Sequence, residues 1–339
     1  MTGTADTAGA AGARGAPRHP LLAGGGWRRM VRDRPLIPLI VLLAALVVAL
    51  ELAKPGTVNG TWVATTIRAA IPLAILAACQ TLAMLTGGID LSVGAVASMA
   101  AYLMATLAIG QGPLVALAVA FIACAIAGLV NGIGIGVFKV HPLIMTLGMS
   151  LVVLGLMSVY QLAMVQSGVE IPATIRSLAS GISFGFIPNN IVVFVPVALL
   201  IVVGLRRTGY GRLLFAVGDN PIAARLAGAR VWQVHVALYI LSALLAAIAG
   251  ILIAGLNNSA TVSLVEQSVL PSVAAAVIGG TSIMGGRGGY AGTIVGALIL
   301  TVVTTLLTVL EMPEAIRQVL FGVIIVAVAA AYTRVSGDA

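Results

Sequence analysis

The stretch Arg206–Val231, RRTGYGRLLFAVGDNPIAARLAGARV, separates two long apolar segments of the chain. It holds a cluster of arginines: Arg206, Arg207, Arg212, Arg225 and Arg230. Asn220 is a favoured N-cap, Pro221 suits the first helical position, and Gly228 can end a helix in the left-handed conformation. The stretch therefore predicts a short helix carried on a basic loop.

The predicted helix is amphipathic, with an apolar face made by Ile222, Ala223, Leu226 and Ala227. Arg225 lies off that face. Two helical turns on a loop are not stable alone. The helix must therefore lie on its own membrane domain, on the lipid surface or on a partner protein.

The 339-residue chain is 60% hydrophobic and 8% charged, and its mean hydropathy is +1.14. Soluble domains carry about 25% charged residues, so the composition indicates a multi-span membrane protein. The formal net charge of +8 comes from arginines between apolar runs, without interleaved aromatic residues. That pattern favours membrane topology over nucleic-acid binding. Cys79 and Cys124 lie inside apolar segments without metal-type spacing, as small core residues do.

A helix needs about 20 mainly apolar residues to span a bilayer. On this rule the sequence predicts an all-α fold, a polytopic membrane helix bundle of about ten transmembrane helices: 35–53, 65–86, 92–109, 113–137, 142–165, 189–205, 232–255, 268–281, 291–310 and 315–333. The eighth segment is short and bounded by glycine, so we expect it to be tilted, broken or re-entrant. The bundle occupies residues 35–333, between a disordered basic tail over 1–34 and a short tail over 334–339.

The distribution of basic residues predicts the orientation. A cytoplasmic N-terminus with ten spans leaves only Lys54, Arg68, Arg176 and Arg317, of the 18 Lys and Arg residues, on the outer side. This excess of positive charge inside is the known bias of membrane proteins, and the opposite orientation would invert it. We therefore expect both termini and the loop 206–231 to be cytoplasmic.

Two glycine-rich segments interrupt the apolar runs. The first, Leu85–Gly94, has the sequence LTGGIDLSVG, in which Gly87 and Gly88 break the helix pattern. Asp90 or Ser92 can cap the helix that follows. An ionisable residue at membrane depth is also a functional candidate, so capping and a functional role both remain open for Asp90.

The second segment, Val277–Gly292, has the sequence VIGGTSIMGGRGGYAG and the same layout. Its glycines are Gly279, Gly280, Gly285, Gly286 and Gly288. Such paired interruptions can mark an internal repeat and a substrate path, but glycine-rich helix crossings explain them equally well. The segment is not a nucleotide loop, because a Walker A sequence needs Gly-Lys-Ser/Thr and the two lysines are followed by Pro55 and Val140.

Polar residues inside the predicted spans are Gln80, Asn131, Ser150, Gln161, Ser242 and Thr305. They can line a path for a polyhydroxylated solute, or they can form hydrogen bonds between helices. His141 and His235 have no further ligand at metal-binding spacing. The sequence has neither a titratable cluster for an enzyme nor a chain of carboxylates for a proton-driven carrier.

Three motifs resemble one known family. They are LTGGIDLSVGAVASMAAYLMA (85–105), AVGDNPIAARLAGARV (216–231) and AAVIGGTSIMGGRGGYAGTIVGALIL (275–300). Over residues 35–333 they resemble, in the right order, the permease subunits of bacterial ABC importers for ribose, xylose and related sugars. The matched motif residues of the first segment include Gly87, Gly88, Asp90, Leu91, Ser92 and Gly94. Permeases for branched-chain amino acids or nucleosides are related alternatives, and a secondary transporter is a more distant one.

The resemblance implies a transport subunit without catalytic or metal-binding residues of its own, in the bacterial cell membrane. Its implied partners are a second permease copy in a homodimer or heterodimer, an ATPase on the cytoplasmic face that binds ATP and magnesium, and an external solute-binding protein. It also implies a coupling helix seated in the ATPase, formed by Asn220, Pro221, Ile222, Ala223, Ala224, Arg225, Leu226 and Gly228. Many such permeases have an acidic residue before the paired alanines, where this chain has Ile222. The small Ala223 and Ala224 are expected to allow close approach of the partner.

Overall fold

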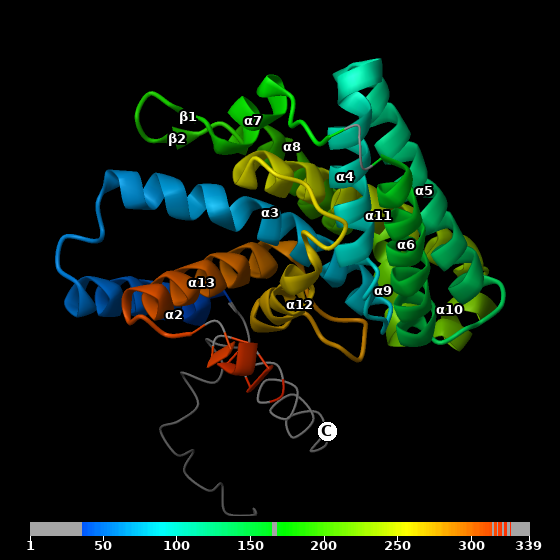
Figure 1. Ribbon diagram of the computed structural model, residues 1–339. Helices are drawn as coiled ribbons and strands as arrows, with labels where there is room; N and C mark the ends of the chain where they lie inside the picture. Colours follow the sequence, from blue (N-terminus) through cyan, green and yellow to red (C-terminus); the bar gives the residue numbers. More distant parts are fainter. Residues whose placement is uncertain are drawn as a thin grey trace, which may run out of the picture. The chain divides into compact units, whose positions relative to one another are not determined.

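The computed structural model describes residues 36–164 and 168–313, together with 315, 316, 318–320, 322, 323 and 326. The predicted tails 1–34 and 334–339 lie outside the described residues, as does most of the tenth predicted span. Figure 1 shows an almost entirely helical chain over these residues. The all-α prediction is therefore confirmed.

Seven helices of the described part are long and apolar enough to cross a membrane. They are α2 (Leu36–Ala53), α3 (Gly60–Leu85), α4 (Val93–Gln111), α5 (Pro113–Gly136), α6 (Pro142–Met164), α11 (Val231–Asn257) and α13 (Tyr290–Val309). A further pair, α8 (Ile191–Arg207) and α9 (Gly209–Asp219), meets at a 68° bend and forms one more candidate span. The chain is thus a multi-pass membrane protein.

The predicted count of ten spans is not confirmed. The eighth predicted segment folds as a 3-10 turn, η1 (Glu266–Ser268), followed by α12 (Val269–Ile278) of 10 residues. A helix of that length rises about 15 Å, half the thickness of a bilayer core. Because the glycine loop after Ile278 stops it, α12 is a broken segment, one of the three forms expected for it.

The core of the bundle is made by α3, α4 and α11. In the spanning window of α4, 78% of residues are buried, against 6% in α2, which lies at the periphery. Glycines let the central helices approach at backbone distance: a Cβ on Gly250 of α11 would overlap the Ala97 carbonyl of α4, and one on Gly128 of α5 would overlap the Tyr239 carbonyl. Small residues at crossings are the usual way in which membrane helices pack.

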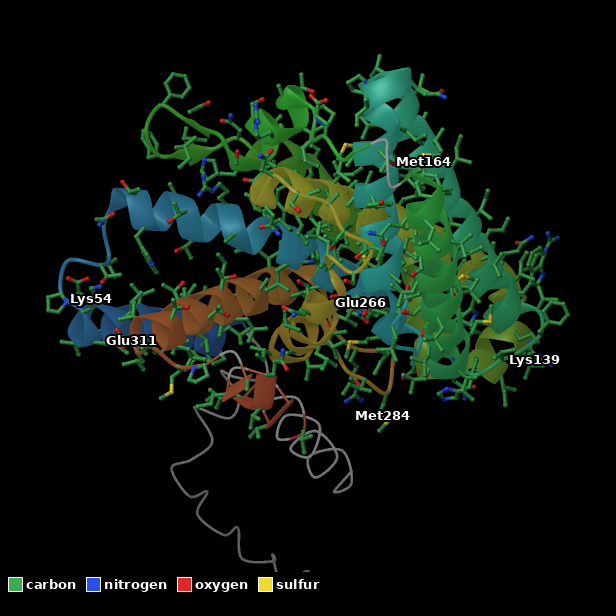
Figure 2. All side chains as sticks on the ribbon, viewed as in Figure 1. Lys54, Lys139, Met164, Glu266, Met284 and Glu311 are labelled. Atoms are coloured by element: carbon green, nitrogen blue, oxygen red, sulfur yellow. The ribbon has the colours of Figure 1, made fainter. Side chains whose placement is uncertain are left out.

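Short elements lie at the two ends of the bundle. The helix α7 (Ala173–Ser180) and the strands β1 (Ile182–Ser183) and β2 (Ile187–Pro188) lie at the top of Figure 1, and α10 (Pro221–Leu226) lies at the lower right. The strands pair antiparallel, with Ile182 opposite Pro188. The helix α7 and the two strands form a small surface element between α6 and α8. Figure 2 labels Lys139 and Met284 on the lower side, with α10, and Met164 on the upper side.

Candidate functional site

Asp90 lies between α3 and α4, and its side chain is 2% exposed. Its Oδ1 accepts hydrogen bonds from the Ser92 N–H at 3.0 Å and the Ser92 hydroxyl at 2.6 Å. Its Oδ2 accepts one from the Ser242 hydroxyl of α11 at 2.8 Å. The carboxylate therefore joins the break after α3 to the central helix α11.

Further polar side chains fix the same break. The Gln80 amide of α3 donates to the Asp90 carbonyl at 2.8 Å and accepts from the Asp90 N–H at 3.2 Å. Asn131 of α5 donates to the Ser92 hydroxyl at 2.9 Å, and Thr146 of α6 accepts from the Leu91 N–H at 3.1 Å. We call Gln80, Asp90, Ser92, Asn131, Thr146 and Ser242 the Asp90 cluster. It draws five helices, α3, α4, α5, α6 and α11, to one point.

Asp90 and Ser92 do not act as helix caps in the way the sequence predicted. Ser92 occupies the N-cap position of α4 but makes no side-chain capping bond, because its hydroxyl donates to Asp90 instead. Gln80, Asn131 and Ser242 make hydrogen bonds between elements, as one of the two interpretations expected, and a solute path along these residues stays a prediction. Thr305, by contrast, bonds within its own helix α13.

We expect the Asp90 cluster to contribute measurably to stability. Asp90→Ala leaves the Ser92 and Ser242 hydroxyls and one N–H without an acceptor, and each unsatisfied buried group costs about 1–3 kcal/mol. Asp90→Asn keeps an acceptor for Ser92 and offers an N–H to Ser242. Thermal unfolding in detergent should therefore show a clearly lower midpoint for the Ala variant only.

The exposed Glu170→Ala is the matched control for that comparison. Equal midpoints for Asp90→Ala and the control would refute the contribution of these bonds. Loss of transport in a normally folded Asp90→Asn would show that the negative charge itself is needed.

The two glycine segments meet in space. The Leu85 carbonyl, at the end of α3, accepts a hydrogen bond from the Gly286 N–H at 3.0 Å. The hydroxyls of Thr81 and Thr293 lie 2.8 Å apart and join α3 to α13. The glycines thus mark close helix approaches, as one of the two interpretations expected, and the internal repeat stays a prediction.

Individual glycines serve turns and crossings. Gly87, Gly280, Gly285, Gly286 and Gly288 have φ of +77°, +89°, +92°, +68° and +139°, which side chains rarely adopt. Gly94 of α4 packs on η1 and α12, where a Cβ would come within 3.2 Å of Glu266 Cα. Gly279 packs against the start of α13 at Thr293. Gly88 lies beside Tyr239, and a Cβ added at Gly88 would lie 3.0 Å from the Tyr239 hydroxyl oxygen.

The short helix predicted in the arginine-rich stretch is α10. The Asn220 side chain accepts hydrogen bonds from the N–H groups of Ile222 and Ala223, both at 3.0 Å, and Gly228 has φ of +89°. The predicted caps are confirmed. The sequence missed α9, which replaces most of the predicted loop. Its signals were Thr208, whose hydroxyl accepts from the Gly211 N–H, and an apolar spacing that the arginines obscured.

The outer face of α10 is apolar. Ile222 is 69% exposed and Leu226 is 85% exposed, whereas Ala224 is buried against its own chain. The expectation that Ala224 allows close approach of a partner is therefore wrong, because this residue points to its own chain. Pro221, Ala223 and Arg225 are exposed.

The described residues around these features show no metal-binding geometry. Over residues 36–164 and 168–313, no three His, Cys, Asp or Glu side chains gather in a way that could hold a metal ion. His235 contacts the Val231 carbonyl of its own helix at 2.9 Å. The arrangement combines hydrogen bonds between helices with glycine-rich breaks in the helices, which suits movement of a helix bundle.

Comparison with known proteins gives a consistent result. Residues 62–329 match the family model described as branched-chain amino acid transport system / permease component. A fructose import permease protein of Rhizobium meliloti is 33% identical, over 86% of this chain and 82% of its own. A ribose import permease protein of Bacillus subtilis is 32% identical, over 84% and 88%. A galactofuranose transporter permease protein of Escherichia coli is 34% identical, over 76% of each chain. No solved structure matches this chain.

Proposed function

The chain belongs to the family of branched-chain amino acid transport system permease components, and from this membership we propose that it is the permease subunit of a bacterial ABC importer for a monosaccharide or related polyol. The relatives' names support a sugar: they include fructose, ribose and galactofuranose permeases. Branched-chain amino acids and nucleosides are less favoured, because these curated relatives name sugars.

The observation that carries the assignment is α10. It is capped at both ends, and it exposes Ile222 and Leu226 side by side on one face of the helix. Large apolar side chains gathered on an exposed surface mark an interaction site. A groove in a cytoplasmic ATPase is the partner that suits a short amphipathic helix. A secondary transporter needs no partner ATPase, so that class of protein would not explain this capped helix.

In the proposed mechanism the permease performs no chemistry. A dimer of the partner ATPase binds ATP and magnesium and closes, and α10 moves with it. Two permease copies then alternate between outward and inward openings, and an external binding protein delivers the solute. The Asp90 cluster belongs to the moving bundle, because its hydrogen bonds join α4, α5, α6 and α11 at the break after α3.

The proposed orientation places α10 in the cytoplasm. Leu226 on α10 is 85% exposed and Phe184 in the β1–β2 turn is 87% exposed, so a cysteine at either position is open to reagents. A membrane-impermeant maleimide added to intact cells should label Phe184→Cys but not Leu226→Cys. In inside-out vesicles the pattern should reverse. The parent chain is the control, since Cys79 and Cys124 are buried. Labelling of Leu226→Cys on intact cells would overturn the orientation.

Co-purification with the neighbouring ATPase tests the function. We expect the tagged chain to retain the ATPase encoded beside it and to support ATP hydrolysis in that complex. The chain alone should hydrolyse no ATP, because neither lysine stands in a Gly-Lys-Ser/Thr sequence. ATP turnover by the chain freed of ATPase would contradict the proposal.

A further inference from the structure

The C-terminal end of α9 touches both glycine breaks of the bundle. The Gly286 N–H donates to the Leu85 carbonyl at 3.0 Å, which joins the end of α3 to the loop before α13. Gly218 of α9 lies directly against this bond. A Cβ at Gly218 would overlap the Leu85 carbonyl oxygen and come within 2.6 Å of the Gly286 nitrogen.

The other partners make equally close contacts. A Cβ on Gly285 would lie 2.7 Å from the Gly218 carbonyl oxygen and 3.1 Å from the Gly87 nitrogen. A Cβ on Gly286 would lie 3.1 Å from Asp219 Cα. We call this three-way backbone contact the glycine junction: Leu85, Gly87, Gly218, Gly285 and Gly286. All of its contacts are made by backbone atoms, so no side-chain rotamer can yield between them.

The junction stands between α10 and the Asp90 cluster. Gly218 comes two residues before Asn220, the N-cap of α10, and Gly87 comes three residues before Asp90. The other side of α10 is less tightly packed, since a cavity of about 430 Å³ lies between it and the neighbouring α9 and α11. The helix therefore has room to move, while the residues just before it are held in backbone contact.

We infer that the glycine junction transmits displacement of α10 to the breaks after α3 and before α13, with Gly218 as the positioning residue. Close-packed backbone contacts cannot deform gradually, so movement of the end of α9 must carry Leu85 and Gly286 with it. The inference rests on the proposed function, because the ATPase supplies the displacement. It adds a residue that lies outside both glycine-rich segments and outside α10.

The first test is Gly218→Ala in the assembled transporter with its ATPase and binding protein. The added methyl must separate α9 from α3, while Ile222 and Leu226 remain free to bind the ATPase. We expect uptake to fall about tenfold or more, within the usual range of coupling between sites. ATP hydrolysis should stay close to that of the parent complex.

The matched control is Gly204→Ala in the adjoining α8, where a Cβ would meet nothing within 4 Å. It should leave both uptake and hydrolysis unchanged. Normal uptake by Gly218→Ala would overturn the inference. So would a parallel loss of uptake and hydrolysis in a normally assembled complex, because that indicates a failed contact with the ATPase.

A second test needs no disturbance of the junction and decides the matter if Gly218→Ala folds poorly. Asp219 and Met284 are exposed neighbours of Gly218 and Gly285. A short bifunctional maleimide should join Asp219→Cys to Met284→Cys. If the junction moves as one body, the cross-linked transporter keeps its uptake. Loss of uptake on cross-linking, with full uptake before it, would show independent movement and refute the inference. Absence of ATP-dependent uptake in the parent complex would instead refute the proposed function.

Discussion

The double substitution Ile222→Asp, Leu226→Asp is expected to lower the affinity of the permease for its ATPase by at least about a hundredfold. Burying one large aliphatic side chain stabilises a contact by about 1.5–3 kcal/mol, and 1.4 kcal/mol is a tenfold change in affinity. Both residues are mainly exposed, so the chain itself should still insert and fold. Titration of the purified permease with its ATPase measures the effect.

Phe184→Asp is the matched control, because Phe184 is an equally exposed apolar residue at the other end of the bundle. It should keep the affinity for the ATPase unchanged. Undiminished binding by the double variant would show that α10 rests on lipid, anchored by the arginines in and around it. In that case charge reversal at Arg212 or Arg225 should cause the greater loss.

Gly250→Val should destabilise the helix bundle. The Gly250 Cα faces the Ala97 carbonyl of α4 at backbone distance, so the valine side chain must push α11 away from α4. Overpacking of this kind costs about 1–3 kcal/mol or more. For a chain of this size that corresponds to a midpoint lowered by roughly 2–6 °C, since each kcal/mol shifts the midpoint of a large chain by about 2 °C. The yield of monodisperse protein should fall as well.

Gly155→Val is the control for that substitution. Gly155 lies in α6, and a Cβ there would meet nothing within 4 Å. The Gly155→Val variant should therefore unfold at the parent midpoint. It is a matched control because both substitutions place a β-branched residue inside a helix. Equal midpoints for the two variants would show that the contact between α4 and α11 contributes little.

Local signals predicted the features that depend on neighbouring residues. Asn220, Pro221 and Gly228 identified α10 with both of its caps, since each acts within a few residues of its own position. Glycines around the eighth segment likewise predicted that it would be tilted, broken or re-entrant. The helix α9 was missed because Arg212 and the arginines just before it resembled a solvated loop, although Thr208 supplies a normal cap.

Local sequence signals could not predict the contacts between residues far apart in the chain. Asp90 was singled out as a candidate, but its partner Ser242 lies 152 residues away, so the sequence favoured a local cap. Gly218 lies in one of the three motifs, but no local signal gave it a role, because a single glycine inside a helix pattern has many explanations. Only the arrangement of α3, α9 and the loop before α13 shows why that position has no side chain.

Uptake into proteoliposomes tests the central claim most directly. The vesicles contain the permease and its ATPase, with α10 facing the lumen, and the binding protein and labelled ribose, fructose or galactose are added outside. We predict accumulation of at least one sugar that requires both ATP in the lumen and the binding protein. Accumulation that is equal without ATP, or that an ion gradient alone drives, would contradict the account.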